Sequence, residues 1–136
     1  MMDSSVPRLL TLVVEHNNDA PALARAAISA FCENRDIPET ALATVKLLVS
    51  QVVTNAVTHP HVERPGNVRL LARLEPGIIH VEVADDVSGF QPSPREPAET
   101  GSGFGLSLLE KEAVRWGVDE DGGNRVWFEV ALDRPA

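Results

Sequence analysis

Hydrophobic and polar residues alternate along four stretches of this chain, the pattern of strands with one buried face. The first stretch runs from Arg8 to Glu15 and the last from Arg125 to Leu132. The second and third are separated by Pro76-Gly77, which is typical of a hairpin turn. The residues expected to face the core are Val68, Leu70, Ala72 and Leu74, then Ile79, Val81 and Val83, and finally Val126, Phe128, Val130 and Leu132.

A first helix is predicted directly after the first strand. Asn18 or Asp19 can cap it, and Pro21 suits its first turn because proline lacks the N–H that would be unpaired there. We expect Cys32 to lie within this helix. Its expected apolar stripe is Leu23, Ala26, Ala27, Ala30 and Phe31.

Two further segments have helical spacing. A longer helix is expected to start at Pro38-Glu39 and to end at Pro60, because proline cannot continue a helix. Its stripe is Val45, Leu48, Val52, Asn55 and His59, so a polar Asn interrupts an apolar face. The segment from Phe104 to Trp116 predicts the third helix.

The predicted order is strand, two helices, hairpin, loop, helix and strand. Helices arranged in this way need one face of a sheet to cover their apolar sides. The sequence therefore predicts an α+β fold, a two-layer sandwich with a mixed, mainly antiparallel sheet and its helices on one face. With 136 residues, the chain is expected to form a single domain over residues 1–136.

Charge and cysteine content indicate which classes of partner and which cellular compartment to expect. Twelve basic and 20 acidic residues give a net charge of −8. This charge argues against direct binding of nucleic acid or of an anionic membrane, because both need clustered cations. Cys32 is the single cysteine, and neither a signal peptide nor an apolar stretch approaching the length of a membrane span is recognised. We expect a soluble, cytoplasmic protein.

A glycine-rich segment, Gly101-Ser102-Gly103-Phe104-Gly105-Leu106, opens the third predicted helix. Exposed amides at a helix start bind phosphate, and glycine lets the backbone approach the oxygens closely. The Lys-Ser/Thr pair of a Walker A loop is missing, and too little chain follows for a Rossmann unit. Taken alone, the segment is equally consistent with a purely structural turn.

Two polar side chains occupy positions where the pattern calls for apolar ones. Alternation directs Asp85 toward the core, where a carboxylate needs a donor such as a purine amino group or the backbone amides of Val87 or Ser88. Asn55 can bond to a neighbouring backbone group or supply an oxygen ligand to Mg²⁺. Each residue alone leaves both roles open.

The segment between these features, Phe90 to Thr100, is rich in proline and has no periodicity. Structureless loops of this length in small domains are usually functional or mobile. We therefore expect residues 90–101 to form a mobile lid over a ligand.

Three segments, taken in order, resemble the N, G1 and G2 boxes of the GHKL (histidine kinase-like) ATPases. They are Gln51–His59 around Asn55, Asp85–Gly89, and Gly101–Leu106. Within that superfamily the chain is most similar to the bacterial anti-sigma-factor serine/threonine kinases, also called switch-protein kinases. The likeness spans nearly the whole sequence, including Arg115–Val118 and the final strand. It implies the GHKL (Bergerat) form of the two-layer sandwich.

The resemblance also implies roles for individual residues. Asn55 would hold Mg²⁺ between the phosphates of ATP, Asp85 would receive the adenine amino group, and Gly89 would shape the base pocket. Gly103, Gly105 and Leu106 would wrap the phosphates. The nucleotide-binding residues expected on this basis are Asn55, Asp85, Gly89, Gly101, Gly103, Gly105 and Leu106. The usual task of the family is to bind a sigma factor and to phosphorylate a serine on an anti-sigma antagonist with ATP.

Two departures from the family pattern bear on activity. Gln51 stands where these kinases usually carry a Glu, and a neutral amide cannot take the proton of a serine hydroxyl near pH 7. Val87 stands where the G1 box has glycine, and its branched side chain crowds the base. Two functions follow: an ATP-dependent anti-sigma kinase, or a catalytically weak or inactive module that regulates a sigma factor or another partner through nucleotide-dependent contact.

Large apolar residues on the outward side of the strands raise a further expectation. Trp127, Leu71 and Leu9 alternate with the inward residues of their strands, so they would gather on the face of the sheet without helices. The resembled family commonly forms dimers. We therefore predict weak self-association, a homodimer, through this face.

Overall fold

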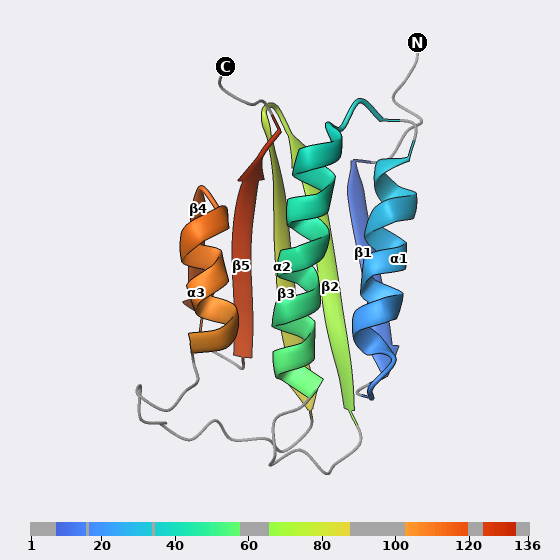
Figure 1. Cartoon of the computed structure of the whole chain (residues 1–136). Coiled ribbons are helices and arrows are strands. Elements are labelled where there is room, and N and C mark those ends of the chain that lie inside the picture. Colours follow the sequence, from blue (N-terminus) through green and yellow to red (C-terminus); the bar gives the residue numbers. More distant parts are fainter. Residues whose placement is uncertain are drawn as a thin grey trace.

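The computed structural model describes residues 8–15, 17–33, 35–57, 66–87, 103–119 and 124–132. In these residues five strands form one sheet, and the helices cover one of its faces (Figure 1). The helices are α1 (Ala20–Cys32), α2 (Glu39–Val57) and α3 (Gly103–Glu112). The strands are β1 (Leu9–Glu15), β2 (Gly66–Glu75), β3 (Ile78–Val87), β4 (Arg115–Asp119) and β5 (Asn124–Ala131).

The sheet has the strand order β1-β2-β3-β5-β4, and each neighbouring pair is antiparallel. The hairpin predicted at Pro76-Gly77 joins β2 to β3. Gly77 has φ +78°, a conformation that residues with a Cβ rarely adopt. The predicted α+β two-layer sandwich is therefore confirmed, with the helices on one face of the sheet.

The core lies between the sheet and the helices, and its strand residues are those that alternation predicted. Val68, Leu70 and Ala72 of β2 and Ile79, Val81 and Val83 of β3 are buried, as are Phe128 and Val130 of β5. From α2 the buried residues are Ala41, Val45, Leu48, Val49, Val52 and Val53. Burial of such side chains is the main favourable term in folding, about 1.5–3 kcal/mol for each large one.

The apolar stripe predicted for α1 is wrong except for Phe31, which is buried as expected. The helix buries Ala20, Ala24, Ile28, Phe31 and Cys32. Leu23, by contrast, is 51% exposed. Alanines lie on every side of this helix, so the hydrophobic pattern fits a stripe shifted by one residue as well as it fits the buried one. The placement of Cys32 inside the helix is confirmed.

The start of α1 also differs in detail from the expectation. Asp19 occupies the N-cap position, but its side chain makes no capping hydrogen bond. Instead Asn17 Oδ1 accepts a hydrogen bond from the Asp19 N–H at 2.8 Å. The preceding turn thus satisfies one amide at the helix entry.

The third helix is shorter than predicted, and a strand follows it. α3 ends at Glu112, and β4, which the sequence analysis missed, contains Trp116. Trp116 pairs with Phe128 and Val118 with Val126, so β5 supplies the hydrogen-bond partners that decide the structure of this segment. A Cβ on Gly117 would lie 2.7 Å from Nε1 of Trp127, so glycine is needed where the indole crosses β4.

Among the described residues, α2 alone is long and apolar enough to match a membrane span, with 19 residues and a mean hydropathy of 1.3 in its most apolar window. The sequence analysis did not expect a segment of this length. The buried residues of α2 pack on the sheet, however, and belong to the main hydrophobic cluster. A buried core helix of a soluble domain meets the same criterion.

Candidate functional site

Those residues singled out from the sequence that the structure describes lie at one end of the sandwich. The last turn of α2, the end of β3 and the start of α3 lie at the lower end of the molecule in Figure 1. α2 packs against both α3 and β3. Residues far apart in the sequence are thus brought to one edge, where α2 contacts both of the other elements.

Gln51 and Asn55 lie one helical turn apart on α2, so they share one side of the helix. Val52 and Val53 are buried and anchor this part of α2 on the sheet. Gln51 is half-buried and Asn55 is exposed, whereas Val53 is buried and Ala56 packs against the core. The predicted place of Asn55 in the apolar stripe is therefore wrong, because the buried side of α2 runs through Val53 and Ala56 instead. An exposed amide needs no internal partner, so the structure gives Asn55 no packing role and leaves its oxygen accessible to a ligand.

Asp85 lies near the end of the central strand β3. It pairs with Val68 of β2 on one side and with Asn124 of β5 on the other. It follows Ile79, Val81 and Val83 in the same alternation, and all three are buried. The backbone position therefore agrees with the sequence analysis, while the role of the carboxylate stays a prediction.

The glycine-rich segment is described from Gly103 onward, where α3 begins, so Gly103, Gly105 and Leu106 belong to its first turn. Gly89, Gly101 and the expected lid at 90–101 lie outside the described residues. The predicted helix start after the glycine segment is confirmed. Its use as a phosphate-binding turn stays a prediction.

The two helix ends at this edge carry opposite partial charges. N–H groups without a partner in the helix make the start of α3 positive, and its first turn contains no acidic residue. Carbonyls without a partner in the helix make the end of α2 negative, and its last turn contains no basic residue. The edge can therefore receive an anion at α3 and a cation at α2.

The donors at this edge fit a Mg²⁺ ion that is held mainly by phosphate and water. Within the described residues, no group of three or more His, Cys, Asp and Glu side chains could hold a metal ion by itself. Mg²⁺ usually takes only one or two protein oxygens beside substrate phosphates. The exposed amide of Asn55 can supply one such oxygen.

The single cysteine is not part of this site. Cys32 is buried at the end of α1, and this burial raises the pKa of its thiol, although the nearby Arg35 guanidinium opposes the shift. A thiol that keeps its proton is a poor nucleophile.

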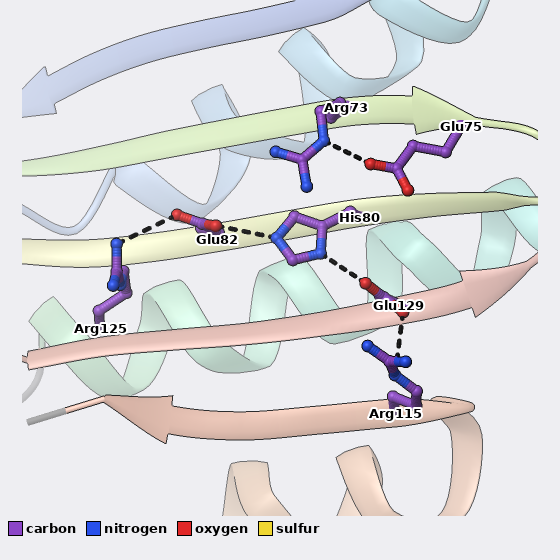
Figure 2. A network of polar contacts seen from close by, with 7 residues as sticks. All are labelled: Arg73, Glu75, His80, Glu82, Arg115, Arg125 and Glu129. Atoms are coloured by element: carbon purple, nitrogen blue, oxygen red, sulfur yellow. Dashed lines mark hydrogen bonds and ion pairs between the residues drawn. The ribbon is translucent and has the colours of Figure 1, made fainter.

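A second polar cluster lies on the sheet face that the helices leave open, and the sequence analysis missed it. Figure 2 shows His80 between Glu82 and Glu129, with arginines around them. Alternation already places His80 and Glu82 on one outward face of β3. The partner on β5 depends on the register between strands, which the local pattern does not contain.

Comparisons with known proteins show the family and the fold of this chain. A family model described as "Histidine kinase-like ATPase domain" matches residues 14–130. The anti-sigma F factor of Geobacillus stearothermophilus is 31% identical over 98 residues, which cover 65% of this chain and 67% of that protein. The anti-sigma F factor of Clostridium botulinum (strain Eklund 17B / Type B) is 28% identical over 110 residues, covering 74% and 76%.

Two solved structures share the fold. The RsbU and RsbW domains of a Mycobacterium tuberculosis protein match with a TM-score of 0.72 and 20% identity, covering 96% of this chain and 34% of that one. The histidine kinase domain of an Erythrobacter litoralis blue-light activated histidine kinase matches with a TM-score of 0.55 and 26% identity, covering 82% and 59%. This chain thus spans about a third of the mycobacterial chain.

Proposed function

Because this chain belongs to the histidine kinase-like ATPase domain family, with residues 14–130 matched, we propose that it is an ATP-binding regulator of the anti-sigma type. The family match confirms the resemblance inferred from the three ordered segments. The observation that carries the proposal is the meeting of Asn55, Asp85 and the start of α3 at one edge of the sandwich (Figure 1). Relatives named anti-sigma F factor support the regulatory part.

In this proposal each element recognises a different part of the nucleotide. The Asp85 carboxylate accepts a hydrogen bond from the adenine amino group, and Gly89 shapes the base pocket. The amides around Gly101, Gly103, Gly105 and Leu106 bind the phosphates at the positive start of α3. Residues 90–101 close over the ligand.

The same proposal assigns Mg²⁺ to the negative end of α2. Asn55 supplies one oxygen ligand, and the phosphates and water supply the others. A cation there is favoured by the carbonyls of the last helical turn, which is typically an effect of about 0.3–1 kcal/mol at an exposed site. When bound, the ion neutralises phosphate charge.

Phosphotransfer is the part of the function that Gln51 weakens. The side chain lies one turn before Asn55 and is half-buried, which is a suitable position for a general base. An amide cannot take a proton from a serine hydroxyl, so we propose slow or absent kinase activity together with retained nucleotide binding. The alternative is a serine/threonine kinase that uses another proton acceptor.

The partners follow from the family rather than from a surface of this chain. We propose a sigma factor and an anti-sigma antagonist as its protein partners, in the cytoplasm and without direct contact to nucleic acid. Support comes from the names of the relatives and from the net charge of −8, which disfavours binding to a phosphate backbone.

Calorimetric titration with ATP tests the assignment of the Mg²⁺ ligand. Binding to the natural protein should be tighter with Mg²⁺ than without it. Asn55→Ala should remove this gain and leave the metal-free affinity unchanged. Asn67→Ala is the matched control, because Asn67 is an exposed residue that pairs with Glu15 on β1. A gain from Mg²⁺ that survives in Asn55→Ala would overturn the assignment.

A further inference from the structure

The sheet face without helices contains a buried polar centre. His80 lies on the central strand β3, where its register partners are Arg73 on β2 and Glu129 on β5. His80 is 7% exposed and Glu129 is 8% exposed, although no described helix covers this face. Buried ionisable groups are costly unless they are paired and hydrogen-bonded. The contacts around His80 therefore decide what this centre does.

Both ring nitrogens of His80 contact carboxylates. Nδ1 lies 2.8 Å from Oε2 of Glu129, and Nε2 lies 2.8 Å from Oε2 of Glu82 (Figure 2). An ionised carboxylate only accepts hydrogen bonds, whereas a neutral imidazole donates from a single nitrogen. Two such bonds therefore require one proton more than a neutral histidine and two carboxylates contain.

Arginines hold the remaining carboxylate oxygens, but more weakly. Arg115 Nε lies 3.3 Å from Oε1 of Glu129, and Arg125 Nη1 lies 3.5 Å from Oε1 of Glu82. Their side chains are 67% and 46% exposed, so water screens these pairs. The shorter and more buried contacts to His80 are the stronger ones.

Neighbouring side chains shield the histidine from water. The ring of Trp127 stacks on His80 with centroids 5.7 Å apart and an angle of 22° between the planes. The guanidinium carbon of Arg115 lies 5.9 Å from the Trp127 ring. Arg73, the neighbour on β2, pairs with Glu75 at 2.6 Å and makes no described contact with either glutamate of the centre.

We propose that His80 is a doubly protonated imidazolium that bridges Glu82 and Glu129, and that this bridge is a proton-dependent clamp between β3 and β5. When His80 loses its second proton, one of the two carboxylates faces a nitrogen lone pair. The negative charges of Glu82 and Glu129 then share a single N–H donor. The clamp then opens.

The clamp reaches the edge of the sheet through Glu129. Arg115 of β4 contacts its carboxylate, and the Val114 N–H donates to its backbone carbonyl at 2.8 Å. β4 pairs only with β5 among the described strands, and it follows α3 directly. Loss of the proton should therefore loosen β4 before the central strands.

Nitrogen NMR of the histidine rings tests the protonation directly. The chain has four histidines, and the signals missing from His80→Gln identify those of His80. At about pH 7.5, where a solvated histidine is mostly neutral, His80 in the natural protein should show two protonated ring nitrogens. A neutral tautomer at this pH would overturn the proposal, and the natural protein alone decides this outcome.

Hydrogen exchange supplies a second readout with a matched variant. Glu82→Gln offers His80 an amide that can donate as well as accept, so the trio no longer needs the extra proton. The clamp in the natural protein needs that proton, so protection of β4 should fall as pH rises. In Glu82→Gln this fall should be at least several-fold smaller. Equal pH dependence in both proteins would overturn the clamp.

Discussion

Strand β3 carries polar residues into two regions that use them in opposite ways. On the open face, His80 bonds to both Glu82 and Glu129 at 2.8 Å, and His80 and Glu129 are almost fully buried. At the end of the sandwich, Asn55 is exposed, and two helix ends present backbone groups that have no partner within their own helix. Polar groups that satisfy one another build structure, whereas polar groups left available at helix ends are suited to a ligand. The two regions should therefore respond differently to substitution.

The largest effect is expected in the self-satisfied region. Glu129→Ala removes the acceptor of His80 Nδ1 and of Arg115. Breaking a buried pair by removing one partner typically costs about 3–5 kcal/mol. Denaturant unfolding measures the decrease in the free energy of unfolding. The control is Glu75→Ala, whose partner Arg73 lies in a pair 42% and 36% exposed. The free energy of unfolding of Glu75→Ala should fall by less than about 1 kcal/mol. Similar losses of unfolding free energy in both variants would show that the buried His80–Glu129 pair is no stronger than an exposed ion pair on the same face.

The second effect concerns rate rather than stability. Gln51→Glu restores a carboxylate one turn before Asn55, so phosphotransfer to an antagonist or ATP hydrolysis should rise by about 10²-fold or more. Gln51→Ala is the matched control, since it removes the amide without adding a base, and it should stay slow. A natural protein that is already fast and unchanged by Gln51→Glu would show that position 51 is not the base.

A smaller effect on stability is expected at Gly117, where β4 packs against the Trp127 indole. In Gly117→Ala the new methyl group would meet the Trp127 indole at 2.7 Å. Overpacking of this kind usually costs about 1–3 kcal/mol. Thermal unfolding should show the loss, while ATP affinity stays unchanged because β4 does not form the nucleotide edge. Lost ATP binding in a folded Gly117→Ala would contradict the separation of the two regions.

The smallest effect concerns self-association, which stays a prediction. Trp127 and Leu71 are only half-buried, but Trp127 is engaged by His80 and by Gly117. Leu9 and Val13 of β1 are more exposed, at 49% and 56%. If the open face forms a weak dimer, Val13→Glu should lower the sedimentation coefficient at high concentration. A natural protein that stays monomeric would end this expectation.

Local patterns predicted the parts of the fold that they determine. The β2–β3 hairpin has strict alternation and a Pro-Gly turn, so both its strands and its buried apolar residues on the helix side were predicted correctly, except that Leu74 is only half-buried. The stripe of α1 was misplaced because alanine is compatible with either side of a helix. β4 was missed because five residues containing a glycine become a strand only through pairing with β5.

The same reasoning explains what could be predicted of the two polar regions. Asn55, Asp85 and the start of α3 were found because each belongs to a segment with a pattern of its own. The bond between His80 and Glu129 joins residues 49 positions apart. It depends on strand register and therefore cannot be read from either segment alone.

The central claim is that the edge formed by α2, β3 and α3 binds adenine nucleotide through Asp85. Calorimetry with ATP and Mg²⁺ should show binding to the natural protein. In Asp85→Asn the affinity should fall about 10- to 100-fold, because the base loses a charged hydrogen-bond acceptor. Asp36→Asn makes the same chemical change at an exposed position between α1 and α2 and should bind as the natural protein does. Equal affinities in all three proteins would contradict the claim.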